Sequence, residues 1–273
     1  MDSINIIAGN NVLRSTVPGR VSNRVFVGFC ALLFAVGVAG TVGWSLSMSG
    51  MGRMSMNHIR SMSWTPMTGQ TWIGLVASFL AMWILMMLAM MLPSLVPILW
   101  RFRRAADRRD RTHLGPITAL AGCGYFLVWV VFGMAVFVSG VSVTEVTAHH
   151  PACSRVAQVA SGFLILVVGA FQFTPLKLRH LACCRMSFST DFECDARIAV
   201  RQGLILGLNC VLCSGGLMVV QAVVGLMDLR EMAFVTAAIT AERLLPRAEP
   251  VARAIGILVV VFGLLRILAT GIV

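Results

Sequence analysis

The chain has 273 residues, of which 58% are hydrophobic and only 12% are charged, and its mean hydropathy is +0.87. Soluble domains carry about 25% charged residues, so this composition excludes a soluble enzyme, which could not cover so much apolar surface with polar groups. The formal net charge of +11 comes from Arg residues clustered between apolar runs. That distribution is typical of membrane-flanking segments, so we expect the lipid bilayer, and not nucleic acid, as the partner.

An all-α bundle of seven transmembrane helices is predicted, because an apolar run of about 20 residues is needed to cross the bilayer as a helix. Residues 1–24 form a polar leader that is retained, and residues 25–273 form a single transmembrane domain. The sixth run is short, so six spans are the alternative. The seven predicted spans are 25–46, 71–99, 115–140, 156–174, 203–224, 231–245 and 252–272.

The loop over residues 47–70, between the first two spans, is rich in methionine. Six Met and one His lie in this otherwise polar, Gly- and Ser-rich segment. Thioether sulfur is a soft ligand that selects Cu(I) over harder divalent ions, so we expect the loop to capture copper. The alternative is that these Met side chains dip into the headgroup region as adaptable apolar groups. The predicted copper ligands here are Met48, Met51, Met54, Met56 and His58.

The second span carries a further set of methionines. Met82, Met86 and Met90 follow one another at intervals of four residues, and Met87 and Met91 occupy an adjacent face. Such a face could pass Cu(I) along the helix, but packing is the more common role of Met in a bundle, and we expect packing here. Two prolines, at positions 93 and 97, are expected to kink or end this helix.

Clusters of Arg predict the orientation of the chain. Residues 101–111 carry six Arg, and residues 177–201 carry four Arg and Lys177, whereas the loop at 47–70 carries only two Arg. Positively charged short loops stay in the cytoplasm, so the first two segments are assigned there and the Met-rich loop outside. We therefore expect a multi-pass protein of the bacterial inner membrane with a cytoplasmic N-terminus.

Cysteine and histidine residues gather after the fourth span and early in the fifth. His180 lies three residues before Cys183 and four before Cys184, so a helix over 176–185 places all three on one side. Cys210 and Cys213 have the spacing that lets two sulfurs grip one ion. We expect Cys210, Cys213, Cys184 and His180 to form one metal site near the cytoplasmic side, with Cys183 as a further ligand. Ordinary packing of small Cys residues in the core is the alternative.

Two other features concern the second half of the chain. The Thr174-Pro175 step is expected to turn the chain back toward the bundle, because the residue before proline avoids the helical region. Glu242 lies at membrane depth, where a charge requires a partner. Arg266 in the last span is the expected partner of Glu242.

Several sequence blocks resemble a known family. They are residues 89–94, 171–185, 207–218 and 225–229, together with the Glu242-Arg243 pair. Over roughly residues 72–246 the chain resembles the DUF2182 family, described as predicted metal-binding integral membrane proteins, and the resemblance implies a membrane fold and a metal site. Two positions depart from the family pattern. His180 replaces a Cys and keeps a possible ligand, whereas Ser214 replaces a Cys and loses one.

Two functions are compatible with these features. The first is a metal-handling membrane protein that binds or transfers Cu(I) between the Met-rich loop and the Cys and His groups, with copper as its ligand. The second is a non-catalytic subunit or assembly factor of a larger membrane complex, with other membrane proteins as partners. An enzyme is not expected, because the sequence offers no catalytic triad, phosphate-binding loop or histidine cluster.

Overall fold

The computed structural model describes residues 3–50, 71–107, 114–149, 153–185, 196–225, 228–245 and 247–271. These ranges hold eight helices and no strand, so the predicted all-α fold is confirmed for them. A backbone inside a bilayer must bond its own N–H and C=O groups, and a helix does so within one segment. The helices are α1 (Ser3–Gly50), α3 (Trp72–Asp107), α4 (Leu114–His149), α5 (Cys153–Phe171), α6 (Pro175–Arg185), α7 (Ala196–Val224), α8 (Leu229–Leu244) and α9 (Ala248–Gly271).

Five of these helices are long and apolar enough to cross a membrane. A sixth span results only if α5 and α6 are taken together as one bent span. α8 has 16 residues, which is shorter than a typical span of about 20. The predicted count of seven spans and the cytoplasmic N-terminus therefore stay predictions. The apolar stretches are Arg24–Ser47, Trp72–Arg101, Gly115–His149, Ala196–Val224 and Ala248–Ala269.

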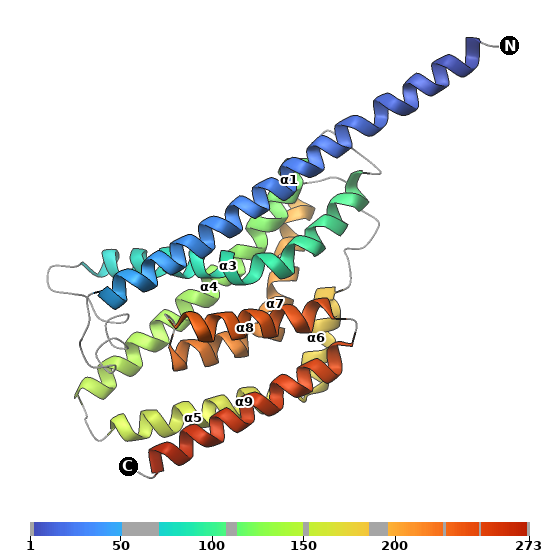
Figure 1. The fold of residues 1–273 in the computed structure, drawn as a ribbon. Helices are drawn as coiled ribbons and strands as arrows, with labels where there is room; N and C mark the ends of the chain where they lie inside the picture. Colours follow the sequence, from blue (N-terminus) through green and yellow to red (C-terminus); the bar gives the residue numbers. More distant parts are fainter. Residues whose placement is uncertain are drawn as a thin grey trace.

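The chain bends by 69° between α5 and α6, at the Thr174-Pro175 step where a turn is predicted. Thr174 Oγ1 accepts a hydrogen bond from the backbone N–H of Lys177 at 3.4 Å, as a helix N-cap does. Pro175 then takes the first position of α6, where its fixed φ suits a helix and no N–H is needed. Because of this bend, α6 packs against α7 and α8 instead of continuing the line of α5 (Figure 1).

Close helix pairs depend on glycine. α4 packs against α7, and a Cβ at Gly203 of α7 would collide with the carbonyl oxygen of Ala121 in α4. α1 lies along α3, where a Cβ at Gly37 would come within 2.8 Å of the backbone nitrogen of Ala89. α5 and α9 form a third pair, visible side by side in Figure 1. Small residues let helix backbones approach closely in membrane bundles, so these contacts fix the arrangement of the helices.

α3 and α7 supply most of the interior of the bundle. More than half of the apolar stretch of each is buried, against less than a quarter for α1, α4 and α9. The outer surfaces carry large apolar side chains, among them Ile73 at 82% exposed, Phe234 at 73% and Leu258 at 69%. Large apolar side chains that are this exposed suit lipid and not water.

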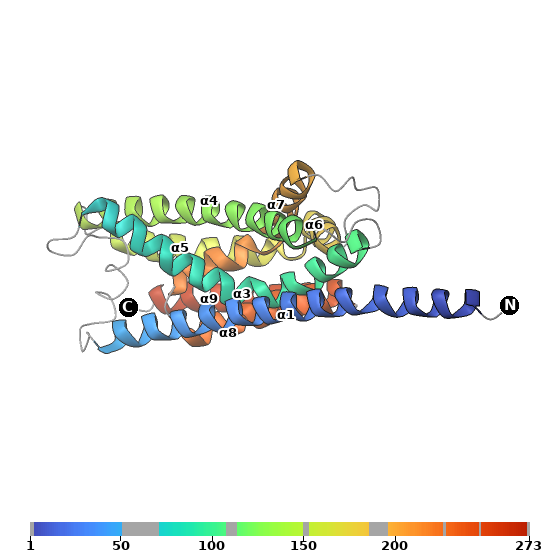
Figure 2. The same ribbon diagram turned by 90° about the horizontal axis from the view of Figure 1, so that it is seen from above.

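Proline bends α3 without ending it. Pro93 and Pro97 lie inside a helix that continues to Asp107, so of the two predicted outcomes the kink is the one found. Proline lacks the N–H that would bond the preceding turn, and the ribbon of α3 changes direction in its second half (Figures 1 and 2). Ser94, between the two prolines, is fully buried.

Candidate metal centre

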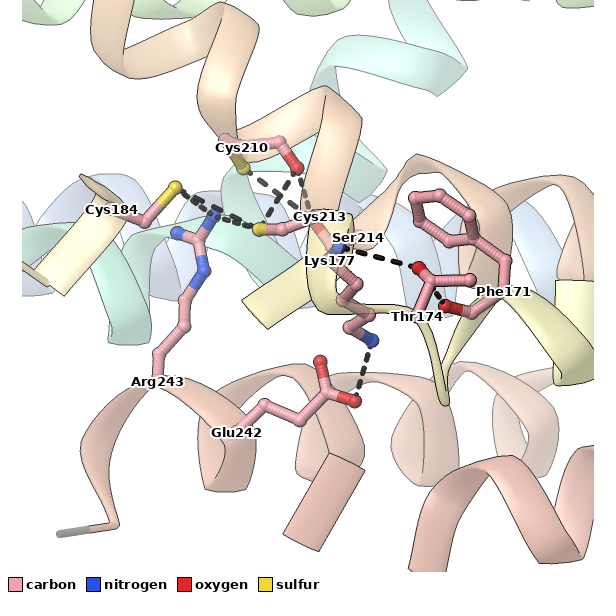
Figure 3. A network of polar contacts seen from close by, with 9 residues as sticks. All are labelled: Phe171, Thr174, Lys177, Cys184, Cys210, Cys213, Ser214, Glu242 and Arg243. Atoms are coloured by element: carbon pink, nitrogen blue, oxygen red, sulfur yellow. Dashed lines mark hydrogen bonds and ion pairs between the residues drawn. The ribbon is translucent and has the colours of Figure 1, made fainter. Parts of the chain in front are cut away.

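Four helices bring sulfur-bearing and charged side chains together in the interior, and Figure 3 shows most of them. All of these side chains are at most 5% exposed. A charged group is rarely buried this deeply unless it is paired. The residues are Ser94 of α3, Lys177 and Cys184 of α6, Cys210 and Cys213 of α7, and Glu242 and Arg243 of α8.

Two thiols from different helices face each other at the centre of this cluster. Cys184 Sγ of α6 lies 3.7 Å from Cys213 Sγ of α7 (Figure 3). Two ligands that share one ion, each at about 2.0–2.3 Å from it, lie within roughly 4 Å of one another. The two sulfurs therefore have the separation that sharing an ion requires.

Cys210 lies one helical turn from Cys213 and has other neighbours. Its Sγ is 3.0 Å from the Tyr125 hydroxyl of α4 and 3.5 Å from Ser214 Oγ, and its carbonyl oxygen accepts from Cys213 Sγ at 3.3 Å. Cys210 is thus part of the cluster, and its sulfur is held by two hydroxyl groups.

Arg243 places a positive charge beside the two thiols. Its Nη2 donates to Cys184 Sγ at 3.8 Å and to Cys213 Sγ at 3.7 Å, and its Nη1 donates to Ser94 Oγ at 3.1 Å. Within the described ranges no carboxylate forms an ion pair with this guanidinium, and its Nε has no hydrogen-bond partner. A buried cation without an anion is costly. The surroundings of the Arg243 guanidinium would therefore stabilise a negatively charged group.

Lys177 and Glu242 form a buried ion pair beside the thiols. Lys177 Nζ lies 2.8 Å from Glu242 Oε1, and the two side chains are 0% and 1% exposed. This pair differs from the expectation that Glu242 meets Arg266. Lys177 lies in α6 and not in an exposed loop, because the bend before α6 turns this side chain into the bundle, whereas the side of the membrane assigned to this segment stays a prediction. The pair is neutral as a whole, so the charge that Arg243 brings is not cancelled by it.

Two other predicted ligands, His180 and Cys183, do not join the two thiols. His180 Nδ1 is 3.0 Å from Asn209 Oδ1, and Cys183, although adjacent to Cys184, is exposed. Met48 belongs to α1, but its side chain is outside the described residues, as are Met51, Met54, Met56 and His58 altogether. The roles of these residues in binding metal therefore stay predictions.

The ligand set at this place is small. In the part of the chain that the structure describes, no group of three or more His, Cys, Asp and Glu side chains is arranged to hold a metal ion. Structural Zn²⁺ sites use four such ligands, which this cluster does not supply. Soft thiols suit Cu(I), a monovalent ion that accepts two sulfur ligands.

Sequence reasoning found the thiols but did not predict Arg243 beside them, and it missed three further neighbours. Lys177 is the only Lys in the chain, and its position one turn after the Thr174-Pro175 step was a signal that it follows the turn into the bundle. Ser94 gave a weaker signal, as a hydroxyl between two prolines in an apolar helix. Tyr125, the only Tyr in the chain, gave no local signal, because its contact with Cys210 joins residues far apart in sequence.

Comparison with known proteins identifies the family. A family model described as PpoB2, a copper chaperone, matches residues 80–266, a range that holds every residue of the cluster. No curated protein and no solved structure matches the chain. This match supports the predicted link to copper. The name of the matched family is not DUF2182, so that part of the prediction is not confirmed. The chain belongs to the PpoB2 copper chaperone family.

Proposed function

We propose that the chain is an integral membrane protein that binds Cu(I) between the thiols of Cys184 and Cys213 and hands it on. The observation that carries this proposal is the pair of buried sulfurs 3.7 Å apart with Arg243 against both of them. Membership of a copper chaperone family supports the choice of copper.

Charge balance favours a monovalent ion. Cu(I) held by two thiolates carries a net charge of −1, which the guanidinium of Arg243 neutralises. A divalent ion held by the same two thiolates would give a neutral complex. Arg243 would then have no negative charge to pair with. Because an uncompensated charge in the interior costs several kcal/mol, the buried Arg243 selects Cu(I) over Zn(II) at this place. Lys177 and Glu242 do not change this balance, because they neutralise each other.

The proposed setting is the bacterial inner membrane, crossed seven times with the N-terminus in the cytoplasm. The start of α1 and the end of α9 lie at opposite ends of the bundle (Figures 1 and 2), which suits an odd number of crossings. α8 would be the short sixth span, with one face buried and the other exposed. The Met-rich segment over residues 47–70 would then collect copper on the outer side, where thiols are lost to oxidation.

Competition with a chromogenic Cu(I) chelator tests the binding site. The full-length protein is purified in detergent, and its affinity for Cu(I) is compared with that of the Cys184→Ser and Cys213→Ser variants. Removal of a residue that only supports a metal ligand lowers metal affinity by roughly 10–100-fold. Each of these two variants removes a ligand itself, so its Cu(I) affinity should fall by more than that. The loss of Cu(I) affinity in Arg243→Met should fall within that 10–100-fold range. This variant should also bind Zn(II) more tightly than the unsubstituted protein does.

Cys183→Ser is the matched control, because Cys183 is adjacent to Cys184 but exposed. It should bind Cu(I) as the unsubstituted protein does. Equal Cu(I) affinity in Cys213→Ser and Cys183→Ser would contradict the proposal.

A further inference from the structure

Cys210 has the spacing of a metal ligand, but its sulfur has other partners. It precedes Cys213 by three residues, and that spacing lets two sulfurs grip one ion. In the structure, Cys210 Sγ lies 3.0 Å from the hydroxyl of Tyr125 and 3.5 Å from Ser214 Oγ. Cys210 and Tyr125 are 0% exposed, and Ser214 is 1% exposed. The availability of this sulfur to a metal therefore depends on two buried hydroxyl groups.

The hydrogens of this group can be assigned one by one, because a carbonyl oxygen can only accept. The carbonyl of Cys210 takes the one hydroxyl hydrogen of Ser214 at 2.7 Å, and also the thiol hydrogen of Cys213 at 3.3 Å. Ser214 has no second hydrogen, so in its contact with Cys210 Sγ the Cys210 thiol is the donor. The Tyr125 hydroxyl is then the donor to the Cys210 sulfur. Ser214 thus holds the hydrogen of Cys210, and Tyr125 occupies a lone pair of its sulfur.

The packing of α4 against α7 keeps Tyr125 beside this sulfur. A Cβ at Gly207, one turn before Cys210, would come within 2.9 Å of the backbone oxygen of Tyr125, so the two backbones are close at this level. A buried hydroxyl that lost its hydrogen-bond partner would be left unsatisfied, which is costly. Both the packing and the hydrogen bond therefore favour the arrangement in which Tyr125 holds Cys210.

Charge balance gives this arrangement a consequence for the choice of metal. Zn(II) held by three thiolates carries a net charge of −1, the same as Cu(I) held by two, and Arg243 could neutralise either complex. Three protein ligands and a water are a common set for Zn(II). A site that offered Cys210 together with Cys184 and Cys213 would therefore lose the preference for a monovalent ion that Arg243 gives to two thiols.

We propose that Tyr125, together with Ser214, determines metal specificity by holding Cys210 out of the site, so that only two thiols reach the ion and Zn(II) is disfavoured. This inference rests on the proposed function and adds the residues that limit the number of ligands. Tyr125 touches no metal in this arrangement. It is a positioning residue that acts through the sulfur of Cys210.

Chelator competition on the full-length protein in detergent tests the inference, with Cu(I) and Zn(II) as the two probes. Tyr125→Phe removes the hydroxyl and keeps the ring, so side-chain volume changes little and the variant should fold. Loss of a residue that only supports a ligand changes metal affinity by about 10–100-fold. Because Tyr125→Phe frees a whole ligand, the ratio of Zn(II) affinity to Cu(I) affinity should rise by more than about tenfold. X-ray absorption at the zinc edge should show three sulfur ligands in this variant.

Two variants serve as controls. In Tyr125→Phe, Cys210→Ser the affinity ratio should return to that of the unsubstituted protein, because the third thiol is gone. Thr41→Val removes a different buried hydroxyl, which bonds the carbonyl of Gly37 in α1, and should leave the ratio unchanged. An equal ratio in Tyr125→Phe and Thr41→Val, or a rise that persists without Cys210, would overturn the inference.

Ser214→Ala tests the other hydroxyl and gives an answer even if Tyr125→Phe does not fold. It removes the acceptor of the Cys210 hydrogen, so it should raise the ratio of Zn(II) to Cu(I) affinity in the same direction, and an unchanged ratio would count against the inference. The two proposals fail on different measurements. The Cu(I) affinities of Cys184→Ser and Cys213→Ser decide whether the thiol site exists, whereas the affinity ratios of the Tyr125 and Ser214 variants decide what keeps Cys210 out of it.

Discussion

At the scale of single residues, the charges inside this bundle have separate roles. Lys177 and Glu242 neutralise each other, whereas Arg243 bonds Ser94 and the two sulfurs and has no carboxylate partner among the described residues. One pair therefore holds α6 to α8, and in the proposed site the cation of Arg243 would compensate the charge of a copper–thiolate complex. Both roles depend on burial, because exposed charges would be screened by water.

The buried pair should matter greatly for stability. Glu242→Gln leaves Lys177 charged and unpaired, which should destabilise the protein by about 3–5 kcal/mol, whereas replacing both residues in Lys177→Met, Glu242→Leu should recover much of that loss. Thermal unfolding of the purified variants measures the effect. Glu249→Gln, which breaks the exposed pair with Arg253, is the control and should cost no more than about 1 kcal/mol. An equally small effect of Glu242→Gln would contradict the role of the pair.

At the scale of helices, most of the architecture could be predicted from hydropathy. Each of the seven predicted spans overlaps a helix in the described ranges, but α1 begins at Ser3, within the predicted leader, and α3 and α4 extend eight or nine residues beyond the predicted ends at 99 and 140. Hydropathy marks where lipid ends and not where the helix ends. The CxxC spacing likewise indicated Cys210 and Cys213, whereas the contacts of Arg243 and Lys177 could not be predicted, because they join residues about 60 positions apart through the bend before α6.

The pairing of α4 with α7 should be sensitive to a single methyl group. Gly203→Ala forces a Cβ against the backbone of Ala121, and such overpacking should cost about 1–3 kcal/mol. Gly122→Ala in α4 is the matched control, since a Cβ there meets nothing within 4 Å, and it should be neutral or stabilise the helix by up to about 1 kcal/mol. Thermal unfolding distinguishes the two variants. If they unfold at the same temperature, close backbone contact does not hold α4 to α7.

At the scale of the whole molecule, the order of segments along the chain bears on the direction in which copper would move. Along α3 the chain leads from the Met-rich segment to Ser94, which accepts a hydrogen bond from Arg243 beside the thiols. In the sequence, the Arg-rich segment 101–111 follows Ser94. In the proposed orientation, copper would therefore move from the outer side toward the cytoplasm.

Labelling of introduced cysteines tests this orientation. Ser61→Cys, in the Met-rich segment, should react with a membrane-impermeant thiol reagent in intact cells, whereas Arg109→Cys should react only after the membrane is permeabilised. The unsubstituted chain gives the background from its own Cys residues. Reaction of Arg109→Cys in intact cells would reverse the orientation and with it the proposed direction of copper movement.

Copper X-ray absorption on protein loaded with one equivalent of Cu(I) tests the central claim most directly. The account predicts a Cu(I) edge with sulfur ligands, unchanged in Cys183→Ser and clearly altered in the Cys184→Ser, Cys213→Ser variant, because thiolates are then lost as ligands. A copper spectrum that is the same in the unsubstituted protein and in the Cys184→Ser, Cys213→Ser variant would contradict it.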